Sequence, residues 1–131
     1  MNIDYARCAP ATYFVMSFIL ATAAYAQAAP EILSGDAVHG KTLYQTCAAC
    51  HSLDDNDLGP KHRGVVGRRA GTVPDYAYSP ALKSSGLTWD PANLDRWLSN
   101  PQALVPGTKM YFLLANPHDR ADIIAYLTDQ K

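Results

Sequence analysis

Apolar residues recur at the three- and four-residue spacing of an α-helix in three stretches of the chain, 37–46, 90–100 and 116–127. The stripes are formed by Val38, Leu43 and Tyr44, by Leu94, Trp97 and Leu98, and by Ile123, Ile124 and Leu127. Apolar and polar residues do not alternate over the length of a strand, and no internal repeat is visible. The pattern predicts an all-α fold.

Short polar residues mark where the helices begin. A capping side chain stands directly before a proline, which fits the first helical position, at Ser79, Asp90 and Asn116. An earlier helix begins after Ser34 or Asp36, either of which can cap it. Gly86 is placed to end the helix that follows Ser79, and the pair Asn100-Pro101 is placed to stop the helix after Asp90.

A long segment rich in glycine and proline, residues 52–78, separates the first helix from the others. A loop of this length is uncommon in a compact domain and is usually functional or wrapped around something. Gly40 interrupts the first helix at a cost of about 1 kcal/mol relative to alanine, and its missing side chain would let another helix approach closely. We therefore expect four or five short helices with long loops around a bound group.

The N-terminal residues differ in kind from the rest. A short head with one basic residue, Arg7, precedes the apolar residues 13–24, and Ala24 and Ala26 form an A-x-A cleavage site. The apolar run is shorter than the roughly 20 residues that a membrane-spanning helix needs. We predict a secretory signal peptide over 1–26, a lead-in over 27–34 and one domain over 35–131, with retention of the first segment as a membrane anchor as the alternative.

The charge balance excludes several classes of partner. The 131 residues carry 11 basic and 12 acidic side chains, so the net charge is −1. Nucleic-acid binding needs a basic stripe and attraction to anionic lipid needs a polybasic cluster, so we expect neither nucleic acid nor stable membrane insertion. After cleavage the remaining thiols are Cys47 and Cys50, and the remaining thioether is Met110.

The strongest motif is C-x-x-C-H at Cys47, Cys50 and His51, which is typical of c-type haem attachment. Two thiols about one helical turn apart can form thioethers with the vinyl groups on one side of a porphyrin, and the histidine that follows places its imidazole nitrogen on the iron. Thioether attachment in bacteria takes place outside the cytoplasm, which agrees with the predicted signal peptide.

Three other uses of the two cysteines are less favoured. A dithiol redox pair would need a neighbouring βαβ pattern, which is absent from the sequence. A structural zinc site needs four ligands, and the nearest further candidate, His62, is eleven residues beyond His51. A disulfide across two residues closes too small a loop to stabilise the fold much.

The second axial ligand of the iron is inferred by elimination. Met110 follows the turn at Pro106-Gly107 and supplies the one thioether of the mature chain. A lone methionine is normally a filler of the apolar core, but a haem needs either a second ligand or an open face. His39 and His118 are expected at the surface, whereas His62 in the long loop is the serious rival to Met110.

The chain resembles the class I cytochromes c, the group that includes mitochondrial cytochrome c and its soluble bacterial relatives, from residue 35 to about residue 127. Besides the attachment motif, the matching segments are 35–44, Gly59-Pro60, the G-x-x-G-R-x-A-G pattern at 64–71, 76–79, 86–89, Asn100-Pro101, 106–110, Phe112, Arg120 and 124–127. The resemblance implies the small single-haem cytochrome c fold, with one haem c bound covalently through two thioethers.

The resemblance also implies roles for single residues. The Pro60 carbonyl would accept the N–H of His51, which fixes the tautomer and makes the imidazole a better donor to a metal. Arg68 would lie near a haem propionate, and Tyr78 and Trp89 would form hydrogen bonds with the propionates.

On the other side of the haem, the resemblance places Thr108 in the loop that carries Met110, and Phe112 beside an exposed haem edge. Leu82 and Trp97 stand where many relatives have Asn and Tyr, so we expect a drier surrounding for the methionine. His62 stands where the family usually has an apolar residue, and Leu113-Leu114 replaces small residues.

These features predict a monomeric, non-enzymatic electron carrier of the periplasm. It would exchange one electron with redox proteins of a respiratory or other pathway at the exposed haem edge, near Ala48, Lys109 and Phe112. Steering toward acidic partners would be weak, because the edge lacks a basic ring. The alternatives are a haem peroxidase or gas-binding sensor, if Met110 is not a stable ligand, and a dedicated subunit of a larger oxidoreductase.

Overall fold

The computed structural model describes residues 33–131. The predicted signal peptide over 1–26, and the lead-in up to residue 32, lie outside the described residues. Within the described part of the chain, no helix has both the length and the apolar character needed to cross a bilayer.

Residues 33–131 form a helical domain with no β-strand. The helices are α1 (Ala37–Leu43), the 3-10 helix η1 (Tyr44–Ala49), α2 (Pro80–Ser84), α3 (Pro91–Ser99), α4 (Pro101–Leu104) and α5 (Pro117–Asp129). In this range the sole β-type pairing is one isolated antiparallel bridge between Arg69 and Thr88. The predicted all-α class and the long loops are confirmed.

The helices begin at the predicted polar residues, and their side chains accept hydrogen bonds from the first free backbone N–H groups. Asp36 accepts from the N–H groups of Val38 and His39. The α2, α3 and α5 helices begin in the same way, at Ser79, Asp90 and Asn116. Gly86 follows the last turn of α2 with a φ of 69°, a left-handed conformation that glycine adopts without strain.

Two helical segments differ from the prediction. The helix expected over 37–46 changes after Leu43 into the tighter η1, which carries the first cysteine of the motif. Asn100 does end α3, but its side chain also accepts from the N–H of Ala103 and so begins α4, a helix of four residues that the sequence pattern did not predict.

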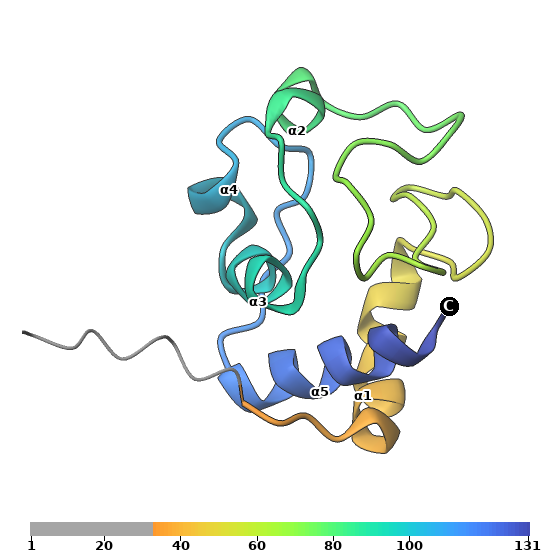
Figure 1. The fold of residues 1–131 in the computed structure, drawn as a ribbon, viewed down its shortest axis with the longest axis vertical. Helices are drawn as coiled ribbons and strands as arrows, with labels where there is room; N and C mark the ends of the chain where they lie inside the picture. The colour runs from red at the N-terminus through yellow and green to blue at the C-terminus, as the bar shows by residue number, and fades with distance from the viewer. Residues whose placement is uncertain (1–32) are drawn as a thin grey trace, which may run out of the picture.

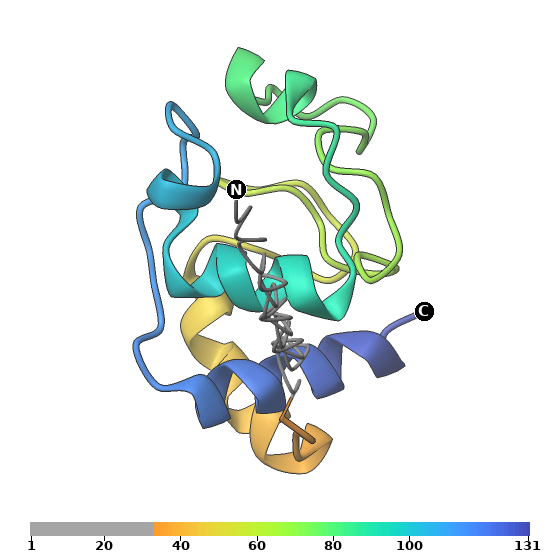
Figure 2. The same ribbon diagram turned by 60° about the vertical axis from the view of Figure 1, so that its left-hand side comes forward.

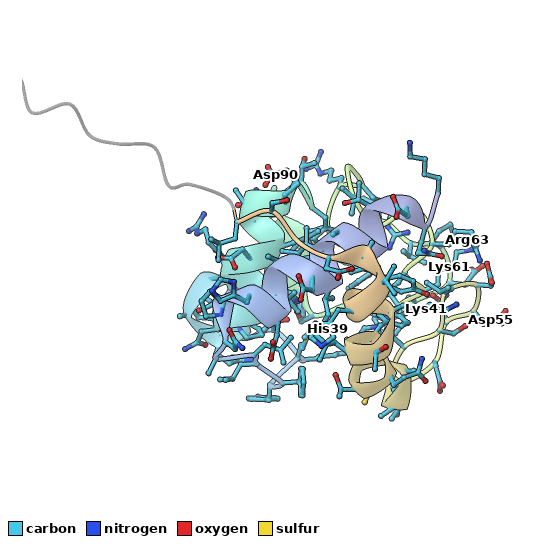
Figure 3. All side chains as sticks on the ribbon, turned by 90° about the horizontal axis from the view of Figure 1, so that it is seen from below. His39, Lys41, Asp55, Lys61, Arg63 and Asp90 are labelled. Carbon is cyan, nitrogen blue, oxygen red and sulfur yellow. The ribbon has the colours of Figure 1, made fainter. Side chains whose placement is uncertain are left out.

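At one end of the molecule α1 crosses α5, and α3 lies against α5 from the other side (Figure 1). The crossing requires Gly40, because a Cβ atom there would lie 1.9 Å from the backbone oxygen of Asp122. Asp122 also accepts from the backbone N–H of Asp36 and pairs with His39 at 2.8 Å. Figure 3 shows His39 beside this crossing.

The long loop between η1 and α2 forms the opposite side of the domain from α3 and α4 (Figures 1 and 2). Its middle part contributes the buried side chains of Val65, Ala70 and Val73. Backbone hydrogen bonds from Gly67 to Trp89 and from Trp89 to Arg68 join it to the segment before α3. Side chains from both sides line one cavity, which is the candidate site.

Candidate functional site

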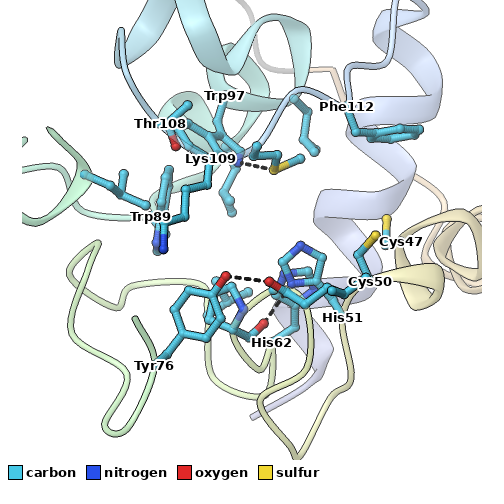
Figure 4. Close-up of a pocket in the computed structure, with 18 of the residues that line it drawn as sticks. Cys47, Cys50, His51, His62, Tyr76, Trp89, Trp97, Thr108, Lys109 and Phe112 are labelled. Atoms are coloured by element: carbon cyan, nitrogen blue, oxygen red, sulfur yellow. Dashed lines mark hydrogen bonds between the residues drawn. The ribbon is translucent and has the colours of Figure 1, made fainter. Parts of the chain in front are cut away.

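A cavity of about 680 Å³ lies between the long loop and the α3–α4 side of the domain. This size falls within the range of about 300–1,000 Å³ that is usual for pockets that bury a small molecule or cofactor. In Figure 4, Trp89, Trp97, Thr108 and Lys109 lie on one wall, and Cys50, His51, His62 and Tyr76 lie on the other. Below, these are called the tryptophan wall and the histidine wall.

The two cysteines lie at the rim of the cavity on the η1 turn, and neither is in a disulfide. The backbone N–H groups of Cys50 and His51 both donate to the Cys47 carbonyl, at 3.0 and 2.9 Å, which holds the motif in one compact turn. Burial raises the pKa of the Cys47 thiol. Reactive dithiols have a lowered thiol pKa, so this environment is unlike that of a redox-active cysteine pair.

The His51 imidazole is oriented by its backbone surroundings. Its Nδ1–H donates to the Pro60 carbonyl at 2.8 Å, so Nε2 carries the lone pair that a metal would bind. A Cβ atom on Gly59 would lie 2.1 Å from the ring, so only glycine allows the loop to pass this close to the imidazole. Burial lowers the His51 pKa, which favours the neutral form that a metal ligand requires.

His62, the rival ligand, lies on the same wall as His51. The two rings stack with centroids 4.0 Å apart and planes 21° apart. A ring nitrogen of His62, Nδ1, lies 3.1 Å from the Tyr44 hydroxyl. Burial, with smaller contributions from His51 and Arg68, lowers the pKa of His62 to about 3, so this imidazole is neutral. A ligand for the opposite face of the iron must come from the other wall.

The side chain on the facing wall is Met110. The indole Nε1–H of Trp97 donates to the Met110 sulfur at 3.1 Å, which locates the sulfur beside Trp97 on the tryptophan wall (Figure 4). The amide of Gln102 holds the backbone of the same residue by donating to the Met110 carbonyl at 2.9 Å. An imidazole nitrogen and a thioether sulfur therefore line opposite walls of one cavity.

Trp97 makes a contact that the sequence did not indicate. We expected Leu82 and Trp97, in place of the usual Asn and Tyr, to make the surroundings of the methionine drier. The Trp97 side chain is only 7% exposed, but its N–H points at the Met110 sulfur and supplies a hydrogen bond there. Leu82, at the other departing position, is buried and lines the cavity as an apolar side chain.

Every residue that the sequence analysis named for the site lines this cavity. The set consists of Cys47, Cys50, His51, Pro60, Arg68, Tyr78, Trp89, Trp97, Thr108, Met110 and Phe112. The Arg68 guanidinium donates to the carbonyls of Lys61 and Arg63, and partial burial lowers its pKa. The propionate contacts themselves stay a prediction.

Two residues were given no role by the sequence analysis, although Tyr76 lies in the matching segment 76–79. Tyr76 lines the cavity and its hydroxyl donates to the Leu58 carbonyl at 2.6 Å, which ties two parts of the long loop together. Gln102 lies on α4, a helix that the sequence pattern did not predict. Neither role could have been identified from spacing: Tyr76 bonds to a residue 18 positions away, and Gln102 reaches residues 108 and 110 from a helix that has no helical period in the sequence.

The rim of the cavity is apolar and open to solvent. Leu58 and Tyr111 are 75% and 77% exposed, and Phe112 is about half exposed. The ammonium group of Lys109, in the loop that carries Met110, donates to the Ala77 carbonyl at 2.5 Å. The exposed edge therefore presents apolar side chains rather than a cluster of charges.

The residues present fit a haem. Apolar walls match a porphyrin, two thiols at the rim are available for thioethers, and a histidine nitrogen and a methionine sulfur on facing walls are the ligand pair of many cytochromes. Among residues 33–131, no group of three or more His, Cys, Asp or Glu side chains is arranged to hold a metal ion.

Comparisons with known proteins agree with this geometry. The family model described as Cytochrome c matches residues 37–131. Cytochrome c2 of Rhodomicrobium vannielii is 47% identical over 112 residues, which cover 82% of this chain and 90% of that protein. Cytochrome c2 of Rhodoblastus acidophilus is 45% identical over 102 residues, covering 75% of this chain and 95% of that protein.

A solved structure is similar as well. That of cytochrome cH from Methylobacterium extorquens superposes with a TM-score of 0.70 at 49% identity, and the match covers 72% of this chain and 98% of that one.

Proposed function

The chain belongs to the cytochrome c family, the electron-transfer proteins that carry covalently bound haem c, and from this premise we propose that it is a periplasmic carrier of single electrons with His51 and Met110 as axial ligands. Cys47 and Cys50 would form the two thioethers. When bound, the haem supplies one iron that alternates between its ferrous and ferric states. The observation that carries the proposal is the position of the Met110 sulfur, beside Trp97 on the wall that faces His51.

The side chains around the two ligands fit a carrier better than a catalyst. The Pro60 carbonyl fixes the His51 tautomer, and the contacts of Met110 with Trp97 and Gln102 hold the thioether. If His51 and Met110 both bind the iron, no position on it would be left for peroxide or a gas. A methionine ligand and an apolar enclosure both raise the reduction potential, so we propose a potential at the high end for c-type haems.

Electrons would enter and leave at the open rim, during brief docking of a redox protein to a monomer of this chain. The exposed side chains of Tyr111, Phe112 and Leu113 support this position. Charges of both signs lie elsewhere on the surface: Figure 3 shows Lys41, Lys61 and Arg63 on the same side as Asp55. Because the exposed rim side chains of Leu58, Tyr111 and Phe112 are uncharged, docking should depend only weakly on ionic strength.

The periplasmic location rests on the predicted signal peptide over 1–26 and on the chemistry of haem attachment, which takes place outside the bacterial cytoplasm. The proposed division into signal peptide, lead-in over 27–34 and domain over 35–131 is tested by the N-terminal sequence of the protein recovered from the periplasm. Cleavage after Ala26 supports it, and an intact N-terminus in the membrane fraction contradicts it.

The carrier function is tested by a redox titration of the purified protein under anaerobic conditions. We expect one reversible one-electron transition, and haem that stays with the polypeptide on a denaturing gel. Replacement of both Cys47 and Cys50 by Ala should abolish the covalent attachment, whereas the matched change Ser99→Ala on the surface should leave it intact. Rapid turnover of hydrogen peroxide, or reversible binding of a gas at the iron, would instead favour a peroxidase or a sensor.

A further inference from the structure

Gln102 bonds to both ends of the segment that carries the proposed sixth ligand. Its Nε2 donates to the carbonyl of Thr108 at 2.8 Å and to the carbonyl of Met110 at 2.9 Å. The two N–H groups of one amide thus donate to the two residues that flank Lys109. The opposite amide orientation would turn the Gln102 carbonyl oxygen toward two other carbonyl oxygens, so the contacts define which end of the amide faces the loop.

Few other contacts hold the loop that carries Met110. The Pro106-Gly107 turn precedes it, with Gly107 at a φ of 87°, and the Thr108 N–H donates to the Val105 carbonyl at 3.1 Å. Beyond Met110 the chain is exposed at Tyr111 and Phe112. On the carbonyl side, the backbone of the methionine is therefore held by a side chain of α4 rather than by regular secondary structure.

We propose that Gln102 is a positioning residue that keeps Met110 on the iron. This inference rests on the proposed function, in which Met110 is the sixth ligand. Gln102 acts through the backbone of Met110, whereas the Trp97 indole acts on the sulfur in the Met110 side chain. The bonds of Gln102 make the ligand-on conformation of the loop the favoured one.

The proposal predicts a measurable competition. An external ligand such as imidazole can bind only when Met110 leaves the iron, so its apparent affinity is scaled by the fraction of molecules in which the loop is open. Two hydrogen bonds of ordinary net strength shift that fraction by about tenfold or more when they are lost. Gln102→Leu and Gln102→Glu, which remove both donors, should therefore bind imidazole about tenfold more tightly than the wild type.

The experiment compares imidazole titrations of the ferric holoprotein at neutral pH, with the far-red sulfur-to-iron charge-transfer band recorded for each protein. Gln102→Arg keeps two parallel N–H donors and should bind imidazole like the wild type. Gln130→Leu is the matched control, because Gln130 also donates its amide to a carbonyl, that of Tyr126, but does so at the end of α5. If Gln102→Leu fails to fold, Gln102→Asn takes its place, because its shorter amide cannot reach both carbonyls.

The outcomes separate the two proposals. Tighter imidazole binding in Gln102→Leu and Gln102→Glu, but not in Gln130→Leu or Gln102→Arg, supports the positioning role when a weakened far-red band accompanies it. Equal imidazole affinity in Gln102→Leu, Gln130→Leu and the wild type overturns it, even if thermal stability falls in both variants, while a normal band in the wild type leaves the proposed function standing. A wild type without the band would refute Met110 ligation, and the role of Gln102 with it.

Discussion

Replacing Trp97 by Phe should lower the reduction potential of the protein. The Trp97 indole N–H lies 3.1 Å from the Met110 sulfur, so its positive end withdraws electron density from the proposed ligand. Ferric iron needs that density more than ferrous iron does. The hydrogen bond therefore disfavours the ferric state, and its removal should favour it.

The size of the shift follows from the strength of the contact. A protein hydrogen bond has a net value of about 1 kcal/mol, and a thioether is a weak acceptor. If about half of that value differs between the two oxidation states, the potential falls by about 20 mV, since about 1.4 kcal/mol corresponds to 59 mV for one electron.

The assay is protein-film or solution voltammetry of Trp97→Phe, Trp97→Tyr and the wild type. Trp97 is buried and packs against Trp89 with ring centroids 5.0 Å apart, so either smaller ring leaves a void that water can enter. Tyr and Phe leave nearly the same void but differ by one hydroxyl donor. The potential of the Tyr variant should lie above that of the Phe variant. Equal potentials in the two variants, or a Phe variant above the wild type, would show that the hydrogen bond to the sulfur does not set the potential.

Three further predictions concern stability and the buried cavity residue Leu82. Gly40→Ala should lower the free energy of unfolding by about 1–3 kcal/mol in denaturant titration, because its Cβ would lie 1.9 Å from the Asp122 backbone oxygen and α1 and α5 must separate. Val38→Ala, at an exposed position of α1, is the control. An equal loss in both variants would show that the close crossing of the two helices is not the cause. The hydrogen bond with Asp122 raises the His39 pKa, so the stabilisation that this pair gives the fold is complete below the unfolded pKa of about 6.5 and is lost as the pH rises through the folded value. The melting temperature should therefore fall from pH 5.5 to 8.5 more in the wild type than in His39→Gln. Identical slopes in the two proteins would rule out a contribution of this pair. Leu82→Asn should lower the reduction potential, because an amide in place of a buried leucine favours the more highly charged ferric state; an unchanged potential in voltammetry would count against it.

The helices could be predicted from the sequence because their signals are local. A capping side chain and a proline at the first helical position act within a few residues, and the caps at Ser79, Asp90 and Asn116 are where the sequence placed them. The four residues of α4 are too few to show a helical period. The pair Asn100-Pro101 was therefore interpreted as a stop, although the same asparagine also caps the next helix.

The members of the site could be predicted, but their contacts could not. The attachment motif, the Gly59-Pro60 pair and Met110 are recognisable in sequence, and the structure brings them to one cavity. By contrast, the stacking of His62 on His51 and the contact of Trp97 with Met110 depend on how distant segments pack. The sequence presented His62 as a rival ligand and Trp97 as a residue that makes the methionine side drier, because residue type alone does not tell which wall a side chain occupies or where its polar atom points.

The central claim is that His51 and Met110 together close both axial positions of the haem iron. It is tested most directly by the optical spectrum of the purified protein, oxidised and reduced, with carbon monoxide added to the reduced form. With both ligands bound, the oxidised protein should show a far-red sulfur-to-iron charge-transfer band, and carbon monoxide should not change the spectrum of the reduced protein. An oxidised protein without that band, and a reduced protein that binds carbon monoxide readily, would contradict it.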